Sequence, residues 1–215
     1  DGFARFVERF PSSEWRLVIG RVAAERYLRG GQPEAAAAQA QKILDDPRAD
    51  DSSRAVAARL LAAAWQSAAA AATREGTLEP VKLLTAAQRK GQDLRPRIPP
   101  EPWKRFVEAA DRYQRLAAQD PAQRLPAAER AAAGVADPSE LDLLAAEVEY
   151  SCDNLEDARQ RLDRIVRSSS GDADRLGVAV PLYLETFLLL RDDVGFESAM
   201  GRLRPAVRAS AREAA

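Results

Sequence analysis

The chain has 215 residues, of which 32 are basic and 33 acidic, so its net charge is −1. It contains 44 alanines, one cysteine and no histidine. Without histidine there is no Ser-His-Asp or Cys-His nucleophile pair, and the usual zinc sites, which need histidine or several cysteines, are excluded. No phosphate loop, dinucleotide fingerprint or metal-ligand cluster is present. We therefore expect no enzymatic activity, no cofactor and no metal ion.

The composition predicts an all-α chain. Alanine is the strongest helix former, and leucine, arginine, glutamine and glutamate follow it. No window alternates apolar and polar residues over the length of a strand. The longest stretch without a charge, Leu60 to Thr73, is too short and too weakly apolar to cross a bilayer, so no transmembrane segment is predicted. The single cysteine, Cys152, is expected to be a buried apolar side chain.

Prolines and glycines divide the chain into successive predicted helices. The predicted helices span 2–10, 13–29, 33–45, 52–74, 78–91, 100–118, 126–134, 139–152, 155–168, 173–191 and 194–213. Ser13 can cap the second of these helices, and Pro33 suits the first turn of the third. Pro205 lies inside the last one and is expected to break or kink it.

The least regular stretch runs from Asp93 to Pro102 and carries four prolines. We predict an extended connector here, between helix pairs in residues 1–92 and helix pairs in residues 103–215. A binding loop is the alternative for this stretch. The two sets of helix pairs are expected to form one continuous array.

A repeated pattern of small and large residues supports this array. The clearest copy has Leu143, Ala146 and Tyr150 on its first helix, then Ala158 and Leu162 on its second. Two helices with this pattern can approach closely at the small residues, while the large apolar residues fill the space between them. The sequence therefore predicts helices packed in pairs.

Other copies of the pattern are less regular. One runs from Gly20 to Leu44, and weaker copies start at Ala58, Trp103 and Tyr183. The copy that starts at Ala58 takes its second helix from residues 78–91. The pattern resembles a divergent tetratricopeptide-repeat array, which implies a right-handed superhelix of antiparallel helix pairs. The spacing of the copies varies instead of staying near 34 residues, so a generic α-solenoid is the main alternative.

The first residues resemble a particular group of these proteins. Phe6 to Ser13 reads Phe-Val-Glu-Arg-Phe-Pro-Ser-Ser and is similar to a phrase of bacterial envelope tetratricopeptide proteins, including outer-membrane assembly lipoproteins. The resemblance implies a truncated first repeat, so we expect the native protein to continue upstream of Asp1. It also implies a place in the bacterial periplasm or at the outer membrane, with a lipid anchor upstream. A cytoplasmic location is the alternative.

The resemblance implies a non-catalytic protein–protein interaction scaffold that binds a protein or peptide in its concave groove. The side chains expected to line that groove are Arg21, Glu25, Leu144, Val148, Leu184 and Leu188. For the leucines and the valine the alternative is packing between neighbouring helix pairs, and for the two charged residues it is a surface ion pair. The alternative function is a helical arm or regulatory domain of a larger enzyme or regulator.

Stripes of arginine raise a third hypothesis, nucleic-acid binding. Arg204, Arg208 and Arg212 recur every four residues, and Arg161 and Arg164 form a shorter stripe. Phosphate binding normally needs a positive net charge, whereas this chain has a net charge of −1. We therefore expect solvated helix faces at these arginines and no nucleic-acid partner.

Overall fold

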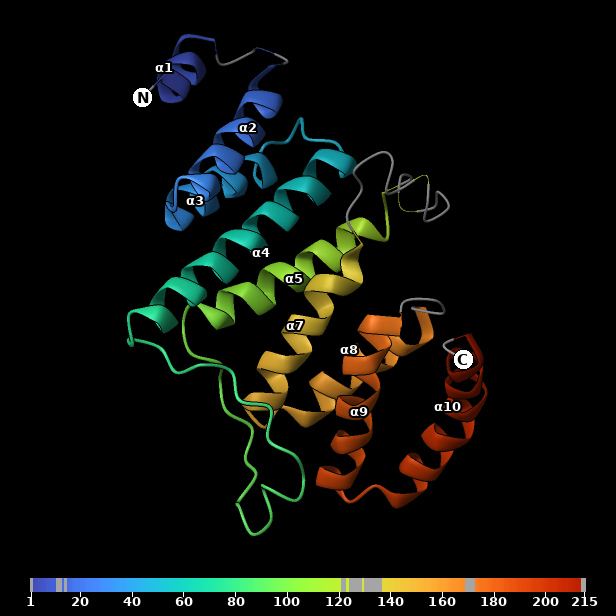
Figure 1. Ribbon diagram of the computed structural model, residues 1–215. Helices are drawn as coiled ribbons and strands as arrows, with labels where there is room; N and C mark the ends of the chain where they lie inside the picture. The colour runs from blue at the N-terminus through green and yellow to red at the C-terminus, as the bar shows by residue number, and fades with distance from the viewer. Residues whose placement is uncertain are drawn as a thin grey trace. The chain divides into compact units, whose positions relative to one another are not determined.

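The computed structural model describes residues 2–10, 13, 15–120, 123, 129, 137–168 and 173–213. Within these ranges every regular element is helical, which confirms the predicted all-α class (Figure 1). The helices are α1 (Gly2–Arg9), α2 (Trp15–Arg29), α3 (Pro33–Leu44), α4 (Asp51–Arg74), α5 (Trp103–Ala117), α7 (Pro138–Ser151), α8 (Leu155–Ser168), α9 (Ala173–Leu190) and α10 (Asp193–Glu213).

The chain folds into two compact units. Unit 1 comprises Asp1–Pro80 and Pro100–Leu141, and unit 2 comprises Val81–Pro99 and Asp142–Ala215. The chain thus enters unit 2 after Pro80, returns to unit 1 at Pro100, and enters unit 2 again within α7.

In unit 1, the helices α2, α3, α4 and α5 pack in chain order, each against the next (Figure 1). Their core is rich in alanine: Ala36 and Ala40 of α3 and Ala58 and Ala62 of α4 have no exposed surface. Because a methyl group takes little space, these helices can lie closer together than large side chains would allow. Phe106 of α5 is fully buried and supplies the bulk that the alanines lack.

Unit 2 has a core of larger side chains. In it α8 packs on α9, and α9 packs on α10. Tyr150 and Leu162 lie in this core together with Tyr183 and Phe187, whose rings meet edge to face at a centroid distance of 5.0 Å. Ala146 and Ala158, the small residues of the clearest copy, are fully buried, as the pattern predicts. Other alanines of the helix pairs are fully buried as well, namely Ala24, Ala36, Ala62 and Ala199, whereas Ala23 is half-buried.

Four helices, α2, α4, α7 and α9, end in the same left-handed turn. The residues with positive φ are Gly31 (68°), Gly76 (72°), Asp153 (62°) and Arg191 (55°). After each of them, the next amide donates to a carbonyl five residues back, as in the bond from Gln32 to Tyr27 at 2.9 Å. This hydrogen-bond pattern is the Schellman motif. After α2, α7 and α9 the next helix begins two residues beyond the left-handed residue, so each turn closes a helical hairpin.

The helix predicted over residues 78–91 is absent. Thr85 and Gln88 do form a capping box, in which the Gln88 amide donates to Thr85 Oγ1 at 3.3 Å and the Thr85 amide donates to Gln88 Oε1 at 2.9 Å. The turn that follows stops at Gly91, where φ is 81°. The segment from Gly76 to Pro102 therefore contains no helix, and the copy of the repeat that starts at Ala58 lacks the second helix expected for it.

Two other expectations concern the later helices. Of the break or kink expected at Pro205, the break does not occur, because α10 continues through this residue to Glu213. A proline removes one backbone hydrogen bond, and the arginine and alanine residues around it are strong helix formers. The helix predicted over 126–134 lies outside the described residues.

Within the described ranges, α4 is the one helix long and apolar enough to cross a membrane. Half of its most apolar window is buried inside the protein, where α3 and α5 pack against it. A core helix has the same length and composition, so α4 is weak evidence for a membrane span. This finding is consistent with the expectation that the chain has no transmembrane segment.

The cap of α4 gives a first prediction. Asp50 Oδ1 accepts the Ser53 amide at 2.7 Å, and hydrogen bonds from the Ser53 hydroxyl and amide hold the pKa of Asp50 below its ordinary 3.8. We expect Asp50→Ala to lower the free energy of unfolding by about 1 kcal/mol at neutral pH in urea denaturation. Because the folded pKa is lowered, this contribution is complete above pH 3.8 and is lost as the pH falls through the folded pKa.

The matched control is Asp51→Ala, which removes the same charge from the first turn of α4 but no capping side chain. Its effect should be smaller, in the range of a few tenths of a kcal/mol expected for a charge near a helix end. If the two variants lost the same free energy of unfolding, the capping role of the Asp50 side chain would be contradicted.

Candidate functional site

The outer face of α2 carries large apolar side chains that nothing in the described ranges covers. Trp15 is 65% exposed, Val18 43% and Val22 48%. Their spacing of three and four residues places them on one face of the helix. Single exposed apolar residues are common, but a contiguous row of them marks an interaction site. We call these three residues the α2 strip.

The opposite face of α2 explains why the strip faces outward. Gly20 and Ala24 are buried there, so small residues make the close contacts of α2 with its neighbours in unit 1. The large side chains are left on the outside. Burying a fully exposed apolar side chain is worth about 1.5–3 kcal/mol, so covering side chains that are about half exposed contributes roughly half of that for each one.

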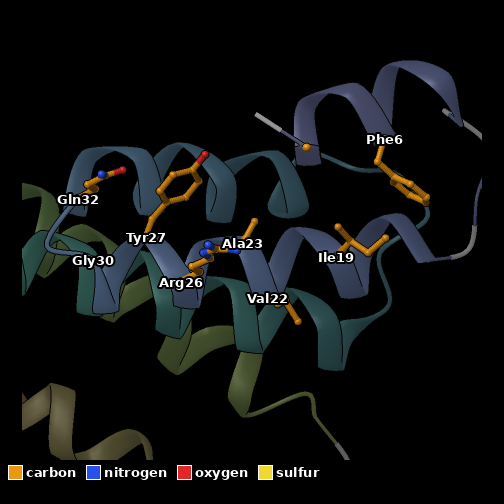
Figure 2. Close-up of a pocket in the computed structure, with 9 residues that line it drawn as sticks. Phe6, Ile19, Val22, Ala23, Arg26, Tyr27, Gly30 and Gln32 are labelled. Atoms are coloured by element: carbon orange, nitrogen blue, oxygen red, sulfur yellow. The ribbon is translucent and has the colours of Figure 1, made fainter.

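A pocket of about 690 Å³ lies beside the strip (Figure 2). The residues that line it are Gly2, Phe6, Ile19, Val22, Ala23, Arg26, Tyr27, Gly30 and Gln32. In Figure 2, Phe6 of α1 and Ile19 of α2 lie toward one end of the pocket, and Tyr27 and Gln32 lie toward the other. Because Val22 belongs to both strip and pocket, the two form one surface, which we call the α2 surface. It is apolar near Phe6 and polar near Arg26.

Two residues predicted to bind a partner border this surface. Arg21 Nε lies 3.9 Å from Glu25 Oε1, and the two side chains are 50% and 39% exposed. Arg21 also lines a smaller pocket of about 110 Å³ together with Val18 and Ile43. An exposed pair four residues apart contributes only about 0.2–0.5 kcal/mol to stability, so both side chains can be engaged by a partner at little cost.

The other four predicted residues lie in unit 2, whereas Arg21 and Glu25 lie in unit 1. Val148 is 1% exposed and is a core residue, which matches the alternative of ordinary packing. Leu144 is half-buried, and Leu184 packs against the core of unit 2. Leu188, at 46%, is the most exposed of the four.

The predicted solvated stripe at Arg161 is wrong. The Arg161 side chain is 6% exposed; its Nε lies 2.8 Å from Glu149 Oε2, and its Nη1 lies 2.9 Å from Asp142 Oδ1. Arg164 approaches Asp142 as well, at 3.1 Å. These residues form an ion network that joins α7 to α8. The side chains of the second stripe lie outside the described residues, namely those of Arg204, Arg208 and Arg212.

Cys152 is buried and forms no disulfide, as expected. Among the residues that the structure describes, no three Cys, Asp or Glu side chains are grouped so that they could hold a metal ion. Burial raises the pKa of Glu147. The nearby carboxylate of Glu149 accepts a hydrogen bond from Arg161.

No family model, no curated protein and no solved structure matches this chain. A function proposed for this chain therefore rests on its own geometry, and we use the α2 surface first. Sequence reasoning missed Trp15, Val18 and Val22 because their spacing is that of any apolar helix face. Such spacing indicates that a face is apolar, and only the three-dimensional arrangement tells whether another helix covers it.

The ion network yields a second prediction. Arg161→Ala leaves Asp142 and Glu149 buried without the guanidinium that contacts both, so the free energy of unfolding should fall by about 3–5 kcal/mol in urea denaturation. Arg167→Ala is the control, because Arg167 is 67% exposed and pairs with Asp163 on the helix surface. This control should lose less than about 1 kcal/mol. Similar losses for the two variants would show that the network contributes no more than a surface pair.

Proposed function

We propose that this chain is a non-catalytic protein-interaction scaffold and that the α2 surface is its docking site. The observation that carries the proposal is the exposure of Trp15, Val18 and Val22 on one helix face beside an open pocket. An exposed aromatic side chain such as Trp15 is the kind of anchor that interfaces use as an energetic centre, and the two valines extend the apolar area around it. The partner segment that fits this surface best is an amphipathic helix, which buries its apolar face in a groove.

The positive charge at the polar end of the pocket indicates which charge the partner helix carries at one of its ends. Arg26 is exposed there and forms no ion pair with the residues that the structure describes. Arg29 lies one turn further along the same helix and is exposed as well. An acidic residue at one end of the partner helix would meet these guanidinium groups and fix its direction.

The wider setting of the proposal is a tetratricopeptide-like array in a bacterial envelope complex. The helical hairpins α2–α3, α7–α8 and α9–α10 support an array, since each has the same turn and buried alanines between its helices. The resemblance of Phe6 to Ser13 to envelope proteins supports the location. A scaffold of this kind presents surfaces to partners and carries out no chemistry of its own.

A binding experiment tests the docking site. We expect wild-type protein, immobilised and exposed to extract of its source organism, to retain a defined partner. Val22→Asp places a charge in the centre of the α2 surface and should reduce the retained partner by about tenfold or more. Leu188→Asp is the matched comparison: it makes the same kind of change at a similarly exposed residue, 46% against 48%, in unit 2, and it tests the groove residue predicted there.

Circular dichroism must show equal helix content in both variants. Equal retention by wild type and Val22→Asp would contradict the assignment of the α2 surface. A partner lost with Leu188→Asp and kept with Val22→Asp would move the docking site to unit 2.

A further inference from the structure

Residues 81–99, which we call the cover segment, lie against the α7–α8 hairpin and α9 within unit 2. The segment is non-helical, and most of its side chains are exposed, including Ile98 at 80%. Leu84 and Leu94 are half-buried, whereas Arg89 is 4% exposed. A charged side chain is thus the most deeply inserted part of the segment.

The Arg89 guanidinium makes contacts through both its nitrogens and its planar face. It donates to the Asp153 carboxylate, and its Nη2 donates to the carbonyl of Tyr150 at 3.0 Å. Its carbon lies 4.7 Å from the centre of the Tyr150 ring, so the face of the group is covered too. The hydroxyl of Tyr150 donates to the carbonyl of Leu84 at 2.6 Å, which fixes the start of the turn that carries Arg89. The planar guanidinium donates two hydrogen bonds from one edge and stacks on a ring with its face, and the ammonium group of a lysine cannot make both contacts.

The remaining polar contacts hold the backbone of the cover segment. Glu185 of α9 accepts the amide of Ala86 at 2.6 Å. Asn154 Nδ2 donates to the carbonyl of Arg97 at 3.0 Å, and the Arg97 amide donates to the carbonyl of Cys152 at 2.9 Å. Backbone contacts that supply affinity, together with one side-chain site that supplies specificity, are how proteins bind peptides.

The residue that contacts Arg89 stands in an unusual backbone position. Asp153 has a φ of 62° at the left-handed position of its turn, where glycine stands after α2 and α4. Glycine takes this conformation without strain, so the turn itself gains nothing from a side chain here. What Asp153 adds is its carboxylate, which contacts Arg89 and lies 3.3 Å from Arg97 Nε.

We propose that the turn at residues 150–154, together with Glu185, is a recognition site for an arginine-bearing peptide turn of a partner protein, and that the cover segment occupies this site in cis. The segment buries little apolar surface, and such elements open locally at far lower cost than core helices. Because it is tethered at both ends, its effective concentration keeps a dilute partner out until the segment is released. The site lies wholly in unit 2, so the proposal does not rest on the α2 surface.

The test uses a fluorescently labelled synthetic peptide with the sequence of residues 81–99. Its binding is measured by anisotropy to the wild-type chain and to a variant in which residues 81–99 are replaced by a Gly-Ser linker of equal length. The linker variant should bind the peptide about tenfold or more tightly than wild type, because its site is not covered. Failure of the peptide to bind a folded linker variant would overturn the proposal.

Peptide variants test the chemistry of recognition. Peptides with Arg89→Ala or Arg89→Lys should bind the linker variant about tenfold more weakly, since neither keeps the guanidinium fork. The Lys90→Ala peptide is the control, because Lys90 is the exposed neighbour of Arg89. Equal affinities of the Arg89→Ala and Lys90→Ala peptides would show that the site does not recognise the arginine side chain.

Changes on the protein side separate this proposal from the docking site on α2. In the linker variant, Asp153→Gly should weaken peptide binding about tenfold, as the Arg89→Ala peptide does, without loss of helix content, because glycine suits the left-handed turn. Val22→Asp should leave peptide binding unchanged. Loss with Val22→Asp, or full binding with Asp153→Gly, would overturn the assignment.

If the linker variant does not fold, hydrogen exchange of the wild-type chain tests whether the cover segment opens independently of the core of unit 2. The amides of Ala86 and Arg97 are both hydrogen-bonded to the site. They should exchange about a hundredfold faster than the amides of α8, because the segment opens while the core stays folded. Exchange at the rate of α8 would mean that the segment is an integral part of unit 2 and would overturn the proposal.

Discussion

The left-handed turn that ends α2, α7 and α9 is the constraint on which the rest of the structure depends. It reverses the chain within two residues, so the next helix must lie against the one just completed. Alanines such as Ala36, Ala158 and Ala199 make that close contact possible, since they have no exposed surface at all. In the α2–α3 hairpin the buried residues of α2 are small, Gly20 and Ala24, and its large apolar side chains lie elsewhere on the helix.

Both proposed binding sites follow from this arrangement. On α2 the small residues face inward, and Trp15, Val18 and Val22 remain on the outside, where they form the apolar surface that we propose as a docking site. After α7 the turn itself bears a carboxylate at Asp153, and the arginine of the cover segment enters beside it. One surface is therefore open and apolar, whereas the other is polar and occupied. A scaffold with these two surfaces could hold one partner continuously and engage the other only when the cover segment is released.

Local signals in the sequence predicted most helices to within a few residues, because prolines, glycines and caps act on their immediate neighbours. The failure at residues 78–91 shows the limit: the Thr85–Gln88 capping box is present, but one capped turn without an apolar face does not extend into a helix. Arg161 was expected in solvent because its partners, Asp142 and Glu149, are distant in sequence. The α2 strip and the Arg89 site could not be predicted, since both depend on which faces meet in the folded chain.

The stability of two glycine-to-alanine variants tests the role of the turn most directly. An added Cβ meets nothing within 4 Å at either Gly31 or Gly177, so neither substitution creates a steric contact. Gly31 has a φ of 68°, whereas Gly177 is exposed within α9. Urea denaturation should show that Gly31→Ala loses about 1 kcal/mol, the cost of left-handed backbone, and that Gly177→Ala gains up to about 1 kcal/mol. A neutral or stabilising Gly31→Ala would contradict the account, because the hairpin would then not depend on its turn.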